Sequence, residues 1–463
     1  MRTPRSGFVR CFSLLFVLAM ILGLVVGCGP AATTATTGTT AATTTTEKLE
    51  KVTITYLNWN GGEEMRLQQE AIAEYMEKNK NVTIEGQWVT ENYDSKINTL
   101  IAADQTPDIY YINEYLAVEW GEKGVALDLA PLFMEMGVNM VDTYVPSAIF
   151  PYEDKVYGLS TGPVCLLLYY NKAMFDDYGL AYPKTDPKAP WTWAEMVETA
   201  KQLTFDTSGN KPGDASFKPK QIKSYGMLAP SFWLFLQPIL YSDNAGYANE
   251  EGKATGLDTD GGREVLKAVY DLIHVDQVSP DAAVAKTLPG TTQAFKNKQV
   301  GMTISGTWEY QNFMKEGIDF GIAPLPMFAK PSNISWAATN QISADSKNPK
   351  EAAKFLRFLT DPDDNPRQLE INFPNKFSWY KDESKLTSWI EGGNFKPDFK
   401  QVIPLIMAEI AVTPENVNLK NFNKLVGEIA QAEIDKYLAD NQDLETTIAN
   451  IVKASEGQWQ GKW

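Results

Sequence analysis

Between residues 51 and 112, hydrophobic and polar residues follow regular patterns. Residues 51–59 (KVTITYLNW) and 82–89 (VTIEGQWV) have the period of two that is typical of strands, and residues 108–112 (DIYYI) form a short apolar run. Residues 65–76 and 93–103, which lie between them, have the wider spacing of helices. This strand–helix–strand–helix–strand order predicts a parallel sheet with helices on its faces.

Helix-start signals mark several later segments. Thr192 and Glu195 form a capping box ahead of an apolar stripe, and Asn348 with Pro349 begins another amphipathic segment. The region from about Phe399 to Ala454 is predicted to be mostly helical. Together with the first sheet, these segments predict an α/β protein.

The amino terminus has the pattern of a secretion signal. Three arginines precede an apolar run of fifteen residues, 12–26, whereas a membrane-spanning helix needs about 20. We interpret residues 1–27 as a signal peptide, with a short anchor helix as the alternative. Residues 31–46 (AATTATTGTTAATTTT) cannot form a core, so residues 28–49 are predicted to be a tether, and an O-glycosylated stalk is compatible with this.

Residues 25–28, Val-Val-Gly-Cys, resemble the bacterial lipobox. That resemblance implies that Cys28 is acylated, with palmitate among the expected lipids, and becomes the first residue of the mature chain. Two or more acyl chains anchor a protein stably, whereas one chain holds it only marginally. We therefore expect a lipoprotein on the extracellular face of the bacterial cell membrane.

Composition narrows the class of ligand. There are 58 acidic and 42 basic residues, a formal charge of −16, which disfavours nucleic-acid binding. One histidine and three cysteines (Cys11, Cys28 and Cys165) are too few for a His-rich or Cys-ligated metal site, and Cys165 is most simply a buried apolar residue. Arginine, the usual clamp for carboxylate or phosphate, is rare. We expect an uncharged ligand, no cofactor and no metal.

Two acidic segments, 257–262 (LDTDGG) and 361–365 (DPDDN), resemble calcium loops only faintly. Neither has the spacing of an EF-hand loop, so we interpret both as solvated turns at helix ends.

Five further segments, taken together and in their order along the chain, carry a resemblance to a known family. They are TPDIYYIN (106–113), VYGLSTGPVCLLLYYNKAMFDDYGL (156–180), PWTWAEMVETAKQLT (190–204), AFKNKQVGMTISGTWEY (294–310) and SADSKNPKEAAKFLRFLTDPDDN (343–365). Together they resemble the family 1 extracellular solute-binding proteins of bacterial ABC importers, the group that includes maltose-binding proteins.

The resemblance implies a periplasmic-binding-protein-like α/β fold of two lobes joined by a hinge. Lobe one is expected at 50–160 plus 336–372, and lobe two at 163–335 plus 373–463. A cleft at the carboxyl ends of the strands would close on the solute, and a membrane permease would recognise the closed form. The resemblance further implies a monomer that binds a mono- or oligosaccharide and catalyses no reaction.

A sugar ring presents apolar C–H faces and a rim of hydroxyls, so its site needs flat aromatic rings and short polar side chains. Candidates lie at strand ends, at the presumed crossings, at helix starts, in the apolar run 229–236 and in the polar turn that follows that run. By resemblance, Trp308 holds the position whose ring stacks on the ligand. The full set is Trp59, Asn60, Glu63, Tyr93, Tyr111, Asn113 and Thr161, followed by Trp233, Asp243, Ser305, Trp308, Trp336 and Asn340.

Three other functions stay open on the sequence alone. An acidic protein rich in Trp and Tyr could bind a cationic or other non-sugar solute. A secreted glycoside hydrolase also uses aromatic rings and a pair of carboxylates, and among 58 acids some pair can always be nominated. A passive surface adhesin is the third alternative.

Overall fold

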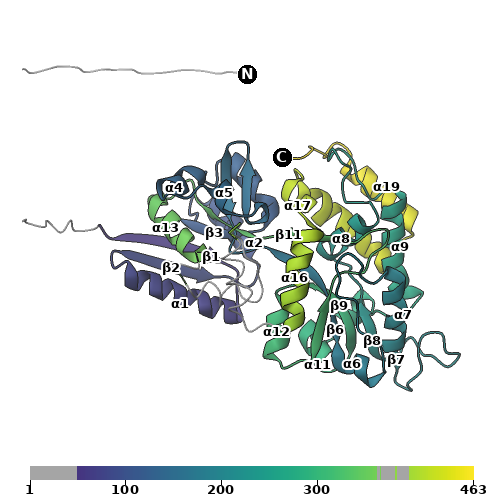
Figure 1. Ribbon diagram of the computed structural model, residues 1–463. Coiled ribbons are helices and arrows are strands. Elements are labelled where there is room, and N and C mark those ends of the chain that lie inside the picture. The colour runs from purple at the N-terminus through teal and green to yellow at the C-terminus, as the bar shows by residue number, and fades with distance from the viewer. Residues whose placement is uncertain (1–49, 362–364, 366–380, 383–395) are drawn as a thin grey trace, which may run out of the picture. The chain divides into compact units, whose positions relative to one another are not determined.

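The computed structural model describes residues 50–361, 365, 381–382 and 396–463, which lie in one compact unit, Glu50–Trp463 (Figure 1). The strands are β1 (Val52–Asn58), β2 (Val82–Trp88), β3 (Ile109–Ile112), β4 (Ile149–Tyr152), β5 (Lys155–Leu159), β6 (Val164–Asn171), β7 (Phe205–Asp206), β8 (Ile222–Leu228), β9 (Val300–Gly306), β10 (Phe320–Ala323), β11 (Asn333–Trp336), β12 (Thr339–Ile342) and β13 (Ala411–Val412). Cys28 and the predicted signal peptide and tether lie outside the described residues.

Helices cover both sheets. The α-helices are α1 (Gly62–Lys78), α2 (Tyr93–Ala102), α3 (Ala117–Glu122), α4 (Ala130–Glu135), α5 (Met140–Thr143), α6 (Lys172–Asp177), α7 (Trp193–Leu203), α8 (Trp233–Ser242), α9 (Asp260–His274), α10 (Ala282–Ala285), α11 (Thr291–Lys296), α12 (Glu309–Lys315), α13 (Pro349–Thr360), α16 (Pro397–Glu409), α17 (Glu415–Asn418), α18 (Gln431–Leu438) and α19 (Leu444–Ser455). Two short 3-10 helices, η1 (Glu114–Leu116) and η2 (Pro146–Ala148), and a π-helix, η3 (Asn423–Ala430), complete the set.

The first sheet has the strand order β2-β1-β3-β12-β5-β4. Strands β2, β1 and β3 are parallel and are joined by α1 and α2, so the predicted strand–helix alternation at the start of the fold is confirmed. Consecutive residues of β1 enter different cores: Tyr56 packs with α1 and α13, and Leu57 packs with α2. The parallel pairing places the carboxyl ends of β1 and β3 at the same edge of this sheet.

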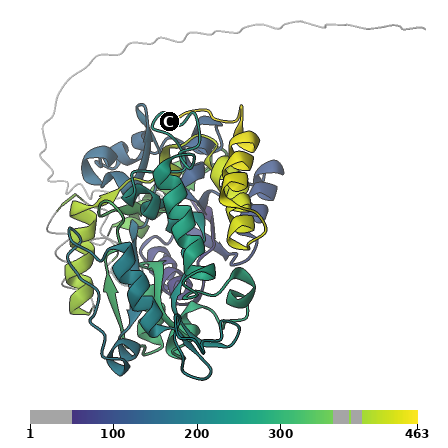
Figure 2. The same cartoon turned by 90° about the vertical axis from the view of Figure 1, so that its right-hand side faces the viewer.

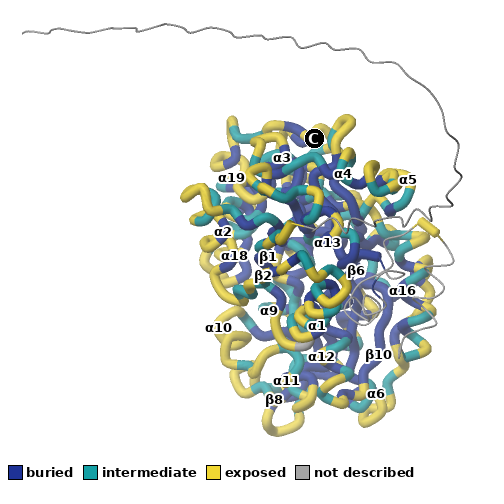
Figure 3. Tube along the Cα trace, turned by 90° about the vertical axis from the view of Figure 1, so that its left-hand side faces the viewer, coloured by how far each residue is buried: buried dark blue, intermediate teal, exposed yellow. Residues whose placement is uncertain are grey.

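The second sheet has the order β13-β11-β6-β9-β8-β7, with β10 also paired to β6. All eight residues of β6 are buried, because helices cover both faces of this central strand. Leu166 and Leu168 enter the core beneath α7, α8 and α9, and Cys165 and Leu167 enter the core beneath α12 and α16. Figure 3 shows the buried strands in dark blue.

The chain passes between the two sheets twice within the described residues. The first passage is residues 160–163, between β5 and β6, and the second is residues 337–338, between β11 and β12. Trp336 is the last residue of β11 and therefore lies in the second sheet, whereas the sequence placed it at the start of a lobe-one segment. The passage from α13 to α16 falls largely on residues outside the described part of the chain.

The predicted C-terminal helical region is confirmed by α16 to α19. Helices α18 and α19 pack beside α9 over the second sheet (Figures 1 and 2). Short helix α17 instead contacts η1, which follows β3 of the first sheet. The ring of Trp463 meets that of Tyr152 in β4 edge to face, with centroids 5.4 Å apart.

The predicted capping box of α7 is present. The Thr192 hydroxyl accepts a hydrogen bond from the backbone N–H of Glu195, and the Glu195 carboxylate accepts one from the backbone N–H of Thr192 (2.7 Å). We expect Thr192→Ala to lower the free energy of unfolding by about 1 kcal/mol, because the backbone N–H of Glu195 loses the hydroxyl that accepts its hydrogen bond. Thr192→Ser should keep the stability in urea denaturation, and an equal loss in both variants would contradict the capping role.

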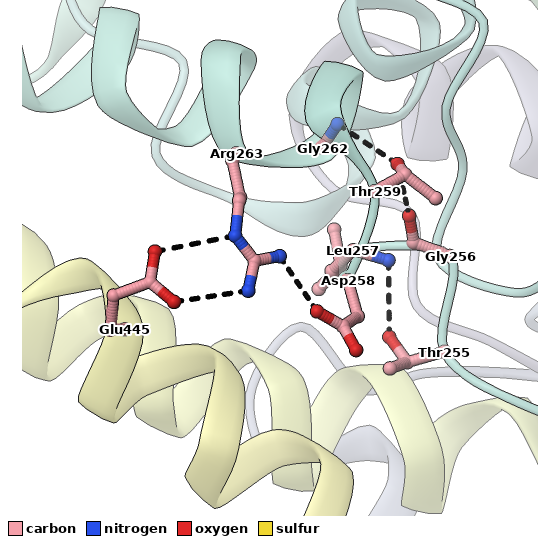
Figure 4. A network of polar contacts seen from close by, with 8 residues as sticks. All are labelled: Thr255, Gly256, Leu257, Asp258, Thr259, Gly262, Arg263 and Glu445. Atoms are coloured by element: carbon pink, nitrogen blue, oxygen red, sulfur yellow. Dashed lines mark hydrogen bonds and ion pairs between the residues drawn. The ribbon is translucent and has the colours of Figure 1, made fainter.

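The faintly calcium-like segment 257–262 is a helix-start turn (Figure 4). Thr259 caps α9 through the N–H of Gly262, and Arg263 forms ion pairs with Asp258 (2.7 Å) and Glu445 (3.1 Å). The described residues contain no cluster of His, Cys, Asp and Glu that could hold a metal ion. None of the described helices combines the length and the apolar character that crossing a membrane requires.

Candidate functional site

Three predicted aromatic residues come together at the carboxyl edge of the first sheet. The Trp59 cluster consists of Trp59, directly after β1, Tyr93 at the start of α2, and Tyr111 in β3. The Trp59 ring lies 4.5 Å from Tyr111 and 5.2 Å from Tyr93, and the Tyr93 hydroxyl donates to the carbonyl of Leu57. Tyr93 and Tyr111 are buried and Trp59 is half-buried, so the cluster is a rigid wall that leaves part of the indole uncovered.

A chain of hydrogen bonds runs from the interior of the first sheet to the start of α1. The Tyr56 hydroxyl donates to Asn340 Oδ1 (3.2 Å) and accepts from Asn58 Nδ2, and Asn58 Oδ1 accepts from the backbone N–H of Asn60 (2.7 Å). Asn60 Nδ2 then donates to Glu64 Oε1 (2.8 Å). Asn340 is fully buried and lies at the inner end of this series of hydrogen bonds. Through the series it positions Asn60 and Glu64.

A cavity of about 680 Å³ lies between the start of α1 and helix α12. Gly61, Gly62 and Glu64 line one side, and Trp308 lines the other. The opposite wall also includes Gln311, Asn312 and Lys315. The lining therefore combines one indole, two amides and one charge of each sign, which suits a polar ligand with no net charge.

The position of the Trp308 indole is set by the turn that follows β9. A Cβ atom on Gly306 would lie 1.9 Å from the indole, so the ring packs directly on this glycine. The Gly306 carbonyl accepts from the Tyr169 hydroxyl (2.9 Å), and the ring of Trp308 meets that of Trp336 edge to face at 6.1 Å. The half-buried indole thus has a defined orientation beside the cavity.

Ser305 lies at the end of the same strand but lines a second cavity, of about 490 Å³. That cavity is bounded by Phe232 and Phe235 at the start of α8 and by the carboxyl ends of β8 and β9. Trp233 is buried nearby against Phe422 of the segment before η3, with ring centroids 5.0 Å apart.

Asn113 follows β3, and its amide donates to the Tyr115 hydroxyl (3.2 Å), whose ring lies 6.0 Å from Phe422. Next to it, the buried carboxylate of Glu114 accepts a hydrogen bond from Asn416 Nδ2 of α17. Burial raises the pKa of Glu114 to about 6, and the Asn416 hydrogen bond opposes that shift only in part. Asn416 Oδ1 is buried and has no hydrogen-bond partner among the described residues.

The remaining candidates do not all meet at the cavity. Thr161 is buried in the first passage between the sheets. Trp336 is buried in β11 behind Trp308, and the side chain of Glu63 is outside the described part of the structure. Asp243 follows the last residue of α8, and because a ten-residue helix is about 15 Å long, it lies far from Trp233 at the other end. Burial raises the pKa of the Asp243 carboxyl.

Sequence reasoning missed the part of the cavity wall that α12 provides. Trp308, Gln311, Asn312 and Lys315 have the spacing i, i+3, i+4, i+7, which places them on one face of a helix. With Trp308 as a candidate, this helical spacing in the sequence indicates Gln311, Asn312 and Lys315 as further candidates. Glu64 was also missed, because the preference went to its neighbour Glu63.

Comparison with known proteins gives a family and a fold. A family model described as bacterial extracellular solute-binding protein matches residues 59–366, more than half of the chain. A relative from Brucella abortus, described as a binding protein, is 23% identical over 273 residues. That match covers 58% of this chain and 62% of the relative, so the chain spans less than two thirds of the relative's length.

A second relative, the multiple sugar-binding protein of Streptococcus mutans, is 22% identical over 333 residues, covering 68% of this chain and 72% of that protein. Among solved structures, an ABC substrate-binding protein from Listeria monocytogenes in complex with cycloalternan superposes with a TM-score of 0.75 at 22% identity. The superposition covers 88% of this chain and 99% of that one. It confirms the predicted α/β fold of the periplasmic-binding-protein type.

Proposed function

This chain belongs to the family of bacterial extracellular solute-binding proteins, as the sequence predicted, and on that premise we propose that it is the sugar receptor of an ABC importer. In this proposal it captures a neutral mono- or oligosaccharide and delivers it to a membrane permease. The names of its relatives support a sugar as the ligand, since one is a multiple sugar-binding protein. A monomer without catalytic activity completes the proposal.

The observation that carries the proposal is the cavity between α1 and α12. Its two walls come from segments beside different sheets, and the chain passes between those sheets through short connections. We propose that the bodies around the first and second sheets are the two lobes, with boundaries near 160–163 and 337–338. A ligand can favour closure only if it contacts both walls at once, as a sugar between Glu64 and Trp308 would do.

The proposed ligand contacts start from Trp308, which lines this cavity and offers flat apolar surface to a sugar face. We propose that Trp59, Asn60, Asn113 and Ser305, which lie outside its lining, add a second ring and hydrogen bonds to hydroxyls for a ligand that extends beyond the cavity. Tyr93, Tyr111, Asn340 and Trp336 hold those groups in position, and Thr161 lies at the hinge. Each net hydrogen bond is worth about 0.5–1.5 kcal/mol, so the polar groups would set the choice among sugars.

Anchoring is the second part of the proposal. We propose that residues 1–27 are removed, that Cys28 carries the lipid, and that residues 28–49 tether the receptor to the extracellular face of the membrane. The sequence of residues 25–28 supports this proposal. Metabolic labelling with an alkyne-bearing palmitate should mark the protein, and Cys28→Ser should abolish the label.

A thermal-shift screen tests the ligand class. A solute that binds only the folded state adds about 2.7 kcal/mol of stability at 100 times its Kd, so a matching sugar should raise Tm by several degrees. The panel should hold neutral mono- and oligosaccharides, and it should include spermidine as a cationic alternative. A shift with spermidine and with no sugar would contradict the proposal. Release of reducing ends from an oligosaccharide by the purified protein would indicate a hydrolase instead.

A further inference from the structure

A cavity of about 870 Å³ lies at the other end of the second sheet from Trp308. Helices α6 and α11 and strand β7 gather at this end (Figure 1), and the cavity is lined by residues that precede β9, such as Gln299. Trp308 follows β9, whose seven residues span about 20 Å at ~3.3 Å per residue. A ligand in this remote cavity would therefore be separate from one held at Trp308.

The remote cavity has an exposed aromatic platform. Tyr178 follows α6 and is 46% exposed, although it is a large aromatic residue. Its ring stacks on buried Phe205 of β7, with centroids 4.5 Å apart and planes inclined by 28°. Because Phe205 holds one face of the Tyr178 ring, the other face is available as a flat surface at small cost in side-chain entropy.

The cavity also contains a polar atom without a partner. Gln299 lines the cavity, and its Oε1 is buried and accepts no hydrogen bond from any described residue. A buried acceptor left unpaired is costly, and a hydroxyl donor in the cavity would satisfy it once the Gln299 amide turns toward the cavity. The side chain of Asn297 lines the same cavity and is exposed.

The charges around the remote cavity balance. Lys223 and Lys298 line it together with Asp177 and Asp206. Lys298 forms an ion pair with Asp177, and Asp206 already accepts hydrogen bonds from the N–H groups of Ser208 (2.7 Å), Asn210 (2.9 Å) and Lys218 (3.0 Å). A lining with equal numbers of positive and negative charges, one ion pair and one carboxylate held by hydrogen bonds does not favour an ionic ligand.

We propose that the remote cavity is a second carbohydrate site, which takes a neutral oligosaccharide or the end of a polysaccharide chain. The C–H face of a sugar ring would lie on Tyr178, and a sugar hydroxyl would donate to Gln299 Oε1. This site goes beyond the proposed function, because it lies outside the α1–α12 cavity and would hold a glycan while that cavity loads and releases its solute.

The test uses the purified full chain with three neutral tetrasaccharides, maltotetraose, cellotetraose and xylotetraose, titrated at millimolar concentration and followed by ligand-observed NMR. Trp308→Ala weakens the main site, and we expect residual binding of at least one tetrasaccharide at the remote cavity. Adding Tyr178→Ala should weaken that residual binding by about tenfold or more.

Tyr182→Ala is the matched control, because Tyr182 is 43% exposed and lies four residues away but does not line the cavity. In the Trp308→Ala background it should leave the residual binding unchanged. Gln299→Leu should remove the residual binding without lowering Tm, whereas a merely structural Gln299 would leave binding as it was.

Two results would overturn the second site. One is the absence of residual binding for all three tetrasaccharides in the Trp308→Ala variant, and the other is residual binding that Tyr178→Ala and Tyr182→Ala change equally. Failure of the proposed function is a different result, since it would appear as wild-type binding that Trp308→Ala does not alter.

Discussion

Trp308→Ala is expected to weaken sugar binding by about 10–100-fold, or about 1.4–2.8 kcal/mol, while the protein stays folded. The indole forms a wall of the α1–α12 cavity and is half-buried, so its removal deletes the apolar surface that faces Glu64 across the cavity. Isothermal titration calorimetry with the sugar identified by the thermal-shift screen would measure the change.

Two further variants serve as comparisons: one displaces the Trp308 ring without removing it, and the other removes a tryptophan outside the cavity. Gly306→Ala places a methyl group where the indole now lies, so the ring must move and binding should weaken although Trp308 is intact. Trp459→Ala removes another half-buried tryptophan, one that packs against the core beneath α9, and should lower Tm without changing affinity. Unchanged affinity in Trp308→Ala would remove this residue from the proposed site.

Glu114→Gln is expected to stabilise the protein by about 2 kcal/mol at pH 7.5 and by much less at pH 4.5. Burial raises the pKa of Glu114 from 4.5 to about 6, so between these values the folded state holds a proton that the unfolded chain has released. The contribution of Glu114 to stability is therefore fully present below about pH 4.5, falls as pH rises, and is lost above about pH 6. A shift of about 1.5 units corresponds to about 2 kcal/mol.

The amide in Glu114→Gln also suits its surroundings. The glutamine oxygen can accept from Asn416 Nδ2 as the carboxylate does, and the new N–H₂ group can donate to Asn416 Oδ1, which has no hydrogen-bond partner among the described residues. Urea denaturation of both proteins at pH 4.5 and 7.5 gives the difference directly. Exposed Glu91→Gln serves as the control, and a stability gain of the same size at both pH values would show that Glu114 does not titrate with unfolding.

The local patterns of the sequence were enough to predict three strands of the first sheet, β1, β2 and β3. The helical segments between these three strands indicated a parallel order, and a parallel order brings Trp59 and Tyr111 to one edge. These inferences depend only on periodicity, which short segments carry by themselves.

Contacts between distant segments were not predictable in the same way. Glu114 and Asn416 are 302 residues apart, and no local period relates them. The amide of Asn340 has the polarity of a ligand contact, but the pairing of β12 with β3 buries it next to Tyr56. Asp243 was chosen for its polar turn, and only the length of α8 shows how far that turn lies from Trp233.

The burial of Cys165 has a practical consequence for measuring motion. It is the sole cysteine between Glu50 and Trp463, and burial raises the pKa of its thiol to about 12. Maleimide dyes react with accessible thiolates, so this cysteine should stay unlabelled in the native protein. A pair of fluorophores on cysteines introduced into the exposed faces of α1 and α12 would then report the distance between these helices, without background labelling of Cys165 in β6.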